Sequence, residues 1–367
     1  MLMKTNLRLI ISIVILISNT VYSQYSGSYY VKAFDPKKSR TTAQTWACIQ
    51  DNSNLLYFAS GNKIVTFDGS SWNSINIEHN ANPLSFNKNK NGDVFVGGNN
   101  AIGFLGSSRN GQLKYYSLKH YNDTIGNIGN VWSVKSHDEY VYFSSSVGVI
   151  IWNTILKKLE VLNAKIDLTL ININDKVGFV DHDKGLCLLE KNKIKIINKK
   201  FKHSIIDAVS FNNKTLILTN DTGLILLNQN GEILSSDIRF NDVNKKCGKL
   251  YPYCIEKSND NRIYIGTIYG GVFEFDLSGK ILNSINSNNG LINDAINNIF
   301  IDNTDNLWLS TDKGIAYVET GAKIKKWTNN EGVESTVEDI TRFNSRLYIA
   351  TDIGFSYMEN GIFKSNK

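Results

Sequence analysis

The sequence has little cysteine, little proline and no strong excess of charge. Its 367 residues include four cysteines and three prolines, and 40 Lys and Arg stand against 34 Asp and Glu, a net charge of +6. So few cysteines exclude a small disulfide-bonded scaffold. So small and dispersed a positive charge argues against a nucleic-acid-binding protein. Beyond the N-terminal segment no apolar run is long enough for a transmembrane helix, so we expect no membrane span in the mature chain.

The first two dozen residues have the pattern of an export signal. Lys4 and Arg8 precede an apolar stretch over residues 9–17, and Val21 and Ser23 are the small or short residues expected before a cleavage site. The apolar stretch is about half of the roughly 20 residues that span a bilayer. We therefore predict a signal peptide over residues 1–23 and a single mature domain over residues 24–367. The mature protein is expected to be periplasmic, on the outer surface or secreted.

The four cysteines and five histidines do not have the spacing of a metal site or of a known catalytic motif. Cys247 and Cys254 are close enough in the sequence for a disulfide, and free thiols are the alternative. Asp181, His182 and Asp183 are ligand-type residues, but three adjacent side chains do not converge on one ion, and a solvated turn is favoured. We predict no metal, no cofactor and no enzymatic activity, with a lyase built on distant residues as the alternative.

One pattern recurs along the whole mature chain: an apolar, β-rich run, a short polar stretch, a glycine and a second apolar run. The first runs of the eight repeats are 56–60, 94–97, 141–144, 177–180, 216–219, 263–266, 307–310 and 347–350. They begin 36 to 47 residues apart, which matches one four-stranded sheet for each repeat. The glycines at 148, 185, 223, 271, 314 and 354 predict tight turns with positive φ, whereas Lys63 and Ala101 stand near the corresponding places in the first two repeats.

These repeats predict an all-β fold, a β-propeller of four-stranded antiparallel blades. The repeat count gives eight blades. Seven is the alternative, in which case one repeat would belong to a second, incomplete propeller. A closed ring is favoured over an open solenoid, because closure protects strand edges without capping elements. Residues 25–40 are a candidate closing strand beside the last blade.

Two stretches also resemble the repeat of the two-component regulator propellers. Gly290–Asp302 and Asn306–Ile315 contain, in order, the Gly-Leu pair, the Asp turn, a Leu-Trp-Leu-Ser-Thr run and the Gly-Ile pair of that repeat, and Ile263–Thr267 with Gly271-Val272 repeats the pattern. The resemblance implies an extracytoplasmic sensor domain, placed ahead of a three-tyrosine β-domain, a membrane span and a cytoplasmic transmitter. It also implies a ligand that is often a carbohydrate. We expect either the sensor part of a longer system or a free-standing propeller that signals through a membrane-bound transmitter protein.

Residues at the entry end of the innermost strands should form a funnel at one end of the central channel. Counting back from the aligned first runs places Trp46, Trp132, Tyr253 and Asn297 there. Aromatic faces beside amides suit the recognition of sugars or peptides, although the same aromatics could pack between blades. The predicted function is therefore a ligand-sensing propeller of a signal-transduction system that binds a small ligand or an oligosaccharide. A structural scaffold in an envelope or secretion complex is the first alternative, and a propeller lyase is the second.

Overall fold

The computed structural model describes residues 27–365, except positions 123, 168, 235–237, 323 and 360. The predicted signal peptide lies outside these residues. The chain divides into two compact units. We call residues 29–324 the ring unit, and Gly27 and Ser28 together with residues 325–365 the terminal unit. The sequence predicts a single domain over residues 24–367, and the structure differs from it in this division.

The ring unit contains seven antiparallel sheets; six have their strands in sequence order, and in the seventh β1 from the N-terminal side pairs with β27. The first four blades are β2 (Thr45–Gln50), β3 (Leu56–Ser60), β4 (Lys63–Phe67) and β5 (Trp72–Asn76); β6 (Pro83–Lys88), β7 (Val94–Gly98), β8 (Ala101–Ser107) and β9 (Leu113–Ser117); β10 (Val134–His137), β11 (Tyr140–Ser145), β12 (Gly148–Asn153) and β13 (Lys158–Leu162); and β14 (Ile171–Ile173), β15 (Lys176–Asp181), β16 (Gly185–Glu190) and β17 (Lys193–Asn198).

The last three blades are β18 (Ile205–Phe211), β19 (Lys214–Thr219) and β20 (Gly223–Leu227); β21 (Pro252–Lys257), β22 (Ile263–Thr267), β23 (Val272–Phe275) and β24 (Ile281–Ile285); and β25 (Ile296–Ile301), β26 (Leu307–Thr311) and β27 (Gly314–Glu319) with β1 (Tyr30–Phe34). The fifth blade departs from the expected four strands. Among the residues that the structure describes, its sheet has three strands and a single bridge pair joins Leu227 to Ile233; the short helix α2 (Asn241–Cys247) precedes the sixth blade.

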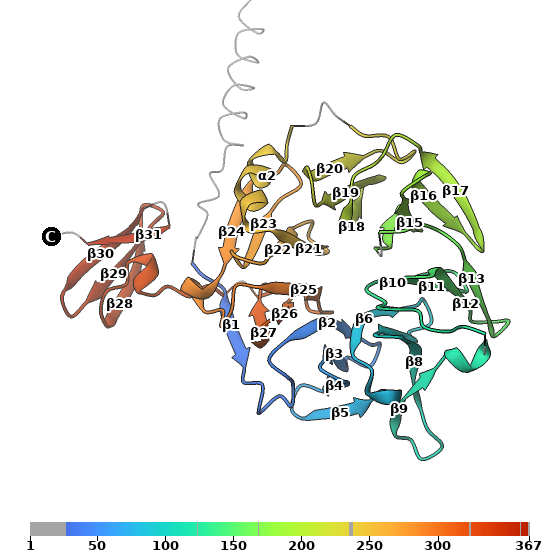
Figure 1. The fold of residues 1–367 in the computed structure, drawn as a ribbon. Coiled ribbons are helices and arrows are strands. Elements are labelled where there is room, and N and C mark those ends of the chain that lie inside the picture. Colours follow the sequence, from blue (N-terminus) through green and yellow to red (C-terminus); the bar gives the residue numbers. More distant parts are fainter. Residues whose placement is uncertain are drawn as a thin grey trace, which may run out of the picture. The chain divides into compact units, whose positions relative to one another are not determined.

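The seven blades form a closed ring. Each innermost strand contacts the next blade, and β2 of the first blade contacts β25 and β26 of the seventh. Figure 1 shows β2, β6, β10, β18, β21 and β25 turned toward the middle of this ring. Strand β1 pairs antiparallel with β27, from Tyr30 opposite Glu319 to Phe34 opposite Ile315. A strand is therefore present within residues 25–40, but it completes the seventh blade and does not lie beside the sheet of the last, eighth repeat as predicted.

The eighth repeat forms its own four-stranded sheet in the terminal unit. Its strands are β28 (Val337–Phe343), β29 (Arg346–Thr351), β30 (Gly354–Glu359) and β31 (Ile362–Ser365). Leu347, Ile349 and Phe363 are buried there, and Trp327 packs against them. The eight predicted repeats are thus confirmed as eight antiparallel sheets, of which seven make up the ring.

The burial pattern explains why the sequence alternates between apolar runs and polar clusters. The second and third strands of most blades are covered on both faces, so that every residue of β3 and of β22 is buried. Outer strands such as β5 are mostly exposed on one face. Asp51, Asn89 and Asp302 explain part of the polar clusters, because the side-chain oxygen of each accepts backbone hydrogen bonds within its own turn.

The predicted turn glycines have positive φ in the structure. Gly148, Gly271 and Gly314 have φ of 117°, 73° and 106°, and Gly185, Gly223 and Gly354 behave in the same way. In the first two blades the left-handed position moves to an earlier residue, Gly61 with φ 58° and Asn100 with φ 51°. The shift confirms that Lys63 and Ala101 sit in turns of a different conformation.

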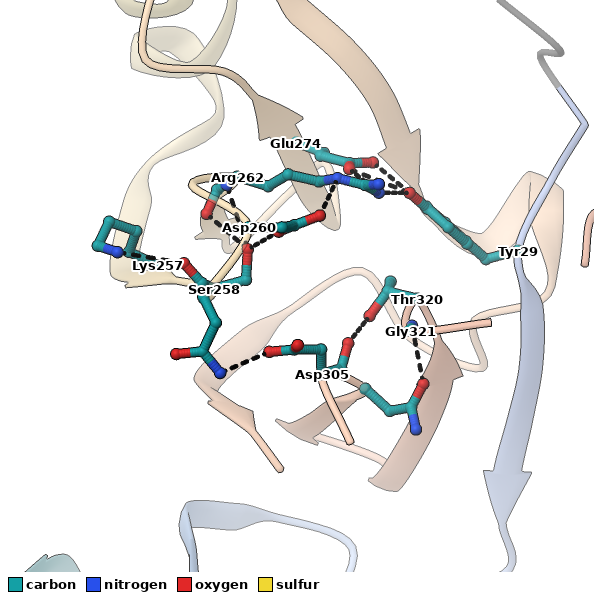
Figure 2. A network of polar contacts seen from close by, with 11 residues as sticks. Tyr29, Lys257, Ser258, Asp260, Arg262, Glu274, Asp305, Thr320 and Gly321 are labelled. Atoms are coloured by element: carbon teal, nitrogen blue, oxygen red, sulfur yellow. Dashed lines mark hydrogen bonds and ion pairs between the residues drawn. The ribbon is translucent and has the colours of Figure 1, made fainter. Parts of the chain in front are cut away.

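A buried polar cluster ties the closing strand to the sixth blade (Figure 2). The Arg262 guanidinium donates to the Tyr29 hydroxyl at 2.9 Å and to Oε1 of Glu274 at 3.0 Å. Its Nε also lies 2.8 Å from Oδ2 of Asp260. The side chain of Glu274 is only 1% exposed, so this carboxylate depends on its partners in place of water. Burial and the neighbouring Glu274 carboxylate raise the pKa of the Tyr29 phenol, which keeps it protonated as a donor.

Candidate functional site

A cavity of about 590 Å³ occupies one end of the central channel of the ring unit. All seven blades contribute to its wall, through residues at or just before the start of their innermost strands. One such residue from each blade, in order, is Trp46, Leu84, Trp132, Thr169, Ile206, Tyr253 and Asn297. The volume lies in the range of small-molecule sites.

β-Bulges aim several of these side chains into the cavity. The pairing between the first and second strands shifts register after Thr45, Pro83, Ile205, Pro252 and Ile296. The residues at or next to the bulges are Trp46, Leu84, Ile206, Tyr253 and Asn297, and all of them line the cavity. A bulge inserts an unpaired residue and turns its side chain out of the regular alternation. In five of the seven blades a bulge therefore presents one side chain at the mouth of the channel.

The two tryptophans predicted for the site contact each other in the wall of the cavity. The rings of Trp46 and Trp132 lie 5.4 Å apart between centroids at an interplanar angle of 70°, an edge-to-face contact. Trp132 remains 37% exposed and Tyr253, from the sixth blade, 39% exposed. Three aromatic side chains thus offer apolar surface at a polar opening, the combination that stacking against a sugar ring requires.

Asn297 lines the same cavity, but its amide nitrogen is already engaged. It donates to the backbone carbonyl of Thr45 at 2.9 Å and to Oδ1 of Asp312 at 2.9 Å. The side chain is 8% exposed. The bond to Thr45 joins the seventh blade to the first and so holds the strand that carries Trp46, whereas the bond to Asp312 stays within the seventh blade. The structure brings all four predicted residues to one cavity, and their contact with a ligand stays a prediction.

Charged residues deeper in the channel were missed by the sequence reasoning. Asp207 in β18 accepts hydrogen bonds from the backbone N–H groups of Ala208 at 2.9 Å and Ile255 at 3.3 Å. Burial raises the pKa of this carboxyl, and the charge of Lys135 in β10 opposes that rise. Both side chains line the cavity. A charged residue inside the apolar innermost strand, as in Ile205-Ile-Asp-Ala-Val209, is the signal that could have identified Asp207.

A second carboxyl group stands beside Asp207. Burial and the nearby charge of Asp207 raise the pKa of Glu256 to about 7, while the N–H of Lys257 donates to its Oε1 at 3.1 Å. The two acids come from neighbouring innermost strands, β18 and β21. Glu256 does not line the cavity itself, but it interacts with the charges of Asp207 and Lys135, which do, so the charge of both carboxyl groups depends on pH.

The disulfide that the sequence allowed between Cys247 and Cys254, with free thiols as the alternative, is not formed. Both thiols are free and buried, as are Cys48 and Cys187. Cys247 lies in α2 and packs with Val243 and Phe273, whereas Cys254 lies in β21 and packs in a different cluster with Ile296. The two side chains belong to separate cores, so proximity in the sequence does not bring them together.

The Asp181-His182-Asp183 segment is a turn whose side chains point to different partners. Oδ1 of Asp181 accepts from the N–H groups of Asp183 and Lys184. His182 lies 2.8 Å from Asp167, and Asp183 lies 2.8 Å from Lys165. Within the described residues no three His, Cys, Asp or Glu side chains are grouped as metal ligands, and no helix is long and apolar enough to cross a membrane.

Seven antiparallel blades around a channel, closed by a strand from the N-terminal side, define a β-propeller. Solved structures share this fold. The extracellular domain of BT3049 from B. thetaiotaomicron, assigned to a hybrid two component system, matches with a TM-score of 0.69 at 17% identity over 92% of this chain and 49% of that one. The extracellular domain of BT4673 from the same organism matches with a TM-score of 0.58 at 14% identity, over 92% of this chain and 53% of that one.

The chain therefore spans about half the length of these extracellular sensor domains. A third propeller, streptogramin B lyase, matches with a TM-score of 0.59 at 12% identity, over 80% of this chain and 98% of the lyase. No family model matches the sequence. No curated protein matches it either. At these identities the likeness establishes the propeller fold, and function depends on the site.

Proposed function

We propose that this chain is an extracytoplasmic ligand-binding propeller of a signal-transduction system. The proposal rests mainly on three aromatic side chains that line one cavity of about 590 Å³, namely Trp46, Trp132 and Tyr253. Likeness to the extracellular domains of two sensor systems supports export and sensing. The protein would deliver its signal through a membrane-bound transmitter, within the same chain or as a partner.

The ligand class that best fits this cavity is an oligosaccharide. Sugar rings present an apolar face that stacks on aromatic side chains and hydroxyl groups that bind amides and carboxylates. The mouth supplies the aromatic faces, and Asn298, Asn220 and Asp207 supply polar groups around them. A sugar would enter with one ring against Trp132, and its hydroxyl groups would face the polar wall.

Thermal stabilisation by a panel of oligosaccharides tests the proposal, because a ligand that binds the folded state raises the melting temperature. Trp46→Ala and Trp132→Ala should abolish the shift that a binding sugar produces in the wild type. Ile155→Ala, an exposed residue in the turn after β12, is the matched control and should keep it. Equal shifts in the wild type and in both tryptophan variants would remove the site assignment.

The same preparations distinguish the alternatives. A scaffold would show a stable co-purifying envelope partner and no small-molecule shift. A lyase would release unsaturated products from acidic polysaccharides, and Glu256 with its pKa near 7 would then be the first base to replace. We propose binding without turnover, so the oligosaccharide should be recovered intact after prolonged incubation.

A further inference from the structure

The sheet of the terminal unit, β28 to β31, has one covered face and one exposed face. Successive residues of a strand point to opposite faces. On the covered face Leu347, Ile349 and Phe363 are buried, and Trp327 packs against them. The opposite face, which we call the aromatic face, carries five large aromatic or aliphatic side chains: Phe343, Tyr348, Phe355, Tyr357 and Ile362.

Much of the aromatic face is open to solvent. Phe343, Ile362 and Phe355 are 65%, 51% and 49% exposed, and Tyr348 and Tyr357 are partly buried. Full burial of an aromatic side chain removes about 150–250 Å² from water, so the five side chains together expose about 400 Å². Apolar patches of that size are often interaction surfaces in soluble proteins.

A shared hydrogen bond aligns the terminal sheet with the seventh blade. The hydroxyl of Thr351 donates to the carbonyl of Gly354 at 2.8 Å, and that of Thr311 donates to the carbonyl of Gly314 at 3.0 Å. Both glycines have positive φ and begin the third strand of their repeat. Strands β29 and β30 of the terminal sheet therefore correspond to β26 and β27 of the seventh blade.

In the seventh blade the residues of this face are covered by a neighbouring sheet. Trp308 and Ile315 occupy the places of Tyr348 and Phe355, and they are only 5% and 0% exposed. Trp308 packs against Phe58 of the first blade, with the ring centroids 5.6 Å apart. The repeat thus builds a face that another sheet covers, and in the terminal sheet the same face is exposed.

Strand pairing sets the side chains of the aromatic face in rows that run across the sheet. From β28 to β31 the rows are Phe343, Arg346, Glu359 and Ile362; then Thr341, Tyr348, Tyr357 and Lys364; and then Asp339, Ala350 and Phe355. The guanidinium of Arg346 lies 5.0 Å from the centre of the Tyr357 ring, so it stays over this face. The first row therefore places a cation and a carboxylate between two apolar side chains, and the third sets a small residue beside a large one.

We propose that a second copy of this chain covers the aromatic face, in a two-fold symmetric dimer of terminal sheets. The symmetry axis lies between the two sheets and runs along their strands, so that β28 faces β31 and β29 faces β30 of the second copy. Each row then faces the same row in reverse order. The facing pairs are Phe343 with Ile362, Arg346 with Glu359, Thr341 with Lys364, Tyr348 with Tyr357, and Ala350 with Phe355.

The facing pairs are complementary, as an interface between identical surfaces requires. Apolar side chains face each other, the guanidinium faces a carboxylate, and the small Ala350 faces the large Phe355. An axis across the strands would instead set Phe343 against Asp339 and Glu359 against Phe355, which buries carboxylates against apolar side chains. The order of residues in the rows therefore selects a second copy with its axis along the strands.

The size of the aromatic face sets the expected strength of the dimer. Its apolar side chains supply about 400 Å² for each copy, half of the roughly 800 Å² that each partner of a standard interface buries. The charged residues of the rows add to this area. We therefore expect a reversible dimer that dissociates on dilution.

Sedimentation velocity of the full chain over a dilution series tests the proposal. The wild type should show a monomer–dimer equilibrium. Phe355→Asp should raise the dimer Kd at least ten-fold, because a carboxylate would be buried in the centre of the interface. Ile340→Asp is the matched control and should dimerise like the wild type, since Ile340 is 55% exposed on the opposite face of the same sheet. Both substitutions are at exposed positions, so both variants should keep the fold.

Charge reversal tests the facing pair of Arg346 and Glu359. Arg346→Glu and Glu359→Arg should each weaken the homodimer at least ten-fold, because like charges would face each other in both halves of the interface. An equimolar mixture of the two variants should form a heterodimer at least ten-fold tighter than either homodimer, since each facing pair then joins opposite charges.

A wild-type chain that stays monomeric at every concentration would overturn the proposal and would leave the aromatic face to another occupant, such as a different protein. A dimer with the same Kd in Phe355→Asp would place the interface elsewhere and would overturn it as well. A mixture of the two charge variants that does not associate would contradict the facing of Arg346 and Glu359. None of these results bears on oligosaccharide binding in the channel, so the dimer and the proposed function are tested separately.

Discussion

The hydroxyl of Tyr29 lies 2.8 Å from Oε2 of Glu274 and 3.0 Å from its Oε1, although 245 residues separate the two in the sequence. Tyr29 immediately precedes β1, the strand that completes the seventh blade, and Glu274 lies in β23 of the sixth. The contact therefore fastens the N-terminal strand to a blade that it does not pair with. Closure of the ring rests on this polar cluster as well as on the pairing of β1 with β27.

Arg262→Ala should destabilise the ring more than Glu274→Gln. Removing the guanidinium leaves the buried Glu274 carboxylate without a counter-charge, at a cost of about 3–5 kcal/mol in the free energy of unfolding. The side chain of Arg262 is 36% exposed, so its guanidinium can be hydrated when the carboxylate is neutralised. Urea denaturation followed by tryptophan fluorescence measures the difference.

Lys176→Ala is the control for this comparison, because Lys176 pairs with Glu190 on the surface and such pairs contribute about 1 kcal/mol or less. Amide hydrogen exchange of β1 should accelerate in Arg262→Ala. Unchanged protection of β1 would show that strand pairing alone holds the ring closed.

Gly271→Ala should lower the stability of the ring by at least about 2 kcal/mol, because left-handed backbone disfavours a side chain by about 1–2 kcal/mol and a clash is added. Gly271 has φ 73°, and a Cβ atom there would lie 2.1 Å from the carbonyl oxygen of Ile285. Gly69 is the matched control, with φ 98° and no atom within 4 Å of the added carbon. Equal effects of the two substitutions in urea denaturation would contradict the packing of the sixth blade.

The stability of the ring should fall as pH rises through the range in which Glu256 ionises. The folded-state pKa of Glu256, about 7, lies above its ordinary value of 4.5, so the folded form holds the proton more tightly. The contribution of this group is fully present below pH 4.5, decreases up to about pH 7 and then levels off. Glu256→Gln should flatten this part of the melting-temperature profile and should melt higher than the wild type at pH 8. Parallel profiles for the two proteins would count against the channel environment described for Glu256.

None of the four cysteines should react with Ellman's reagent in the folded protein. All four are buried, and burial raises the pKa of Cys187 to about 11 and that of Cys247 to about 12, so little reactive thiolate forms at neutral pH. Four thiols should titrate after unfolding in denaturant. Two missing thiols after unfolding would reveal the Cys247 to Cys254 disulfide that the structure lacks.

The blades could be predicted from the sequence because each one is marked by a pattern of neighbouring residues. Apolar runs followed by glycine mark the buried hairpins, and the positive φ of Gly148 and Gly314 is a requirement that the residue type itself reveals. Counting back from these runs also found Trp46 and Tyr253, because the repeat keeps the distance between the first two strands nearly constant. The count could not show that a bulge turns these side chains into the channel, since a bulge is a property of strand pairing.

Features that depend on distant parts of the chain were less accessible. The division between the seventh and eighth sheets follows from β1 taking the fourth position beside β27, which the sequence of the eighth repeat does not reveal. Lys135 and Asp207 come together only because the third and fifth blades face one channel. The left-handed backbone of His79 could not be predicted, because histidine does not favour that conformation as glycine does.

Calorimetric titration of the strongest-binding oligosaccharide into the wild type, Trp132→Phe and Trp132→Ala tests the central claim most directly. Loss of an aromatic stacking partner at the channel mouth should raise the Kd at least ten-fold in Trp132→Ala, which corresponds to about 1.4 kcal/mol. Trp132→Phe keeps an aromatic face and should lose less. An oligosaccharide that binds all three proteins with the same Kd would contradict the assignment of the channel mouth as the ligand site.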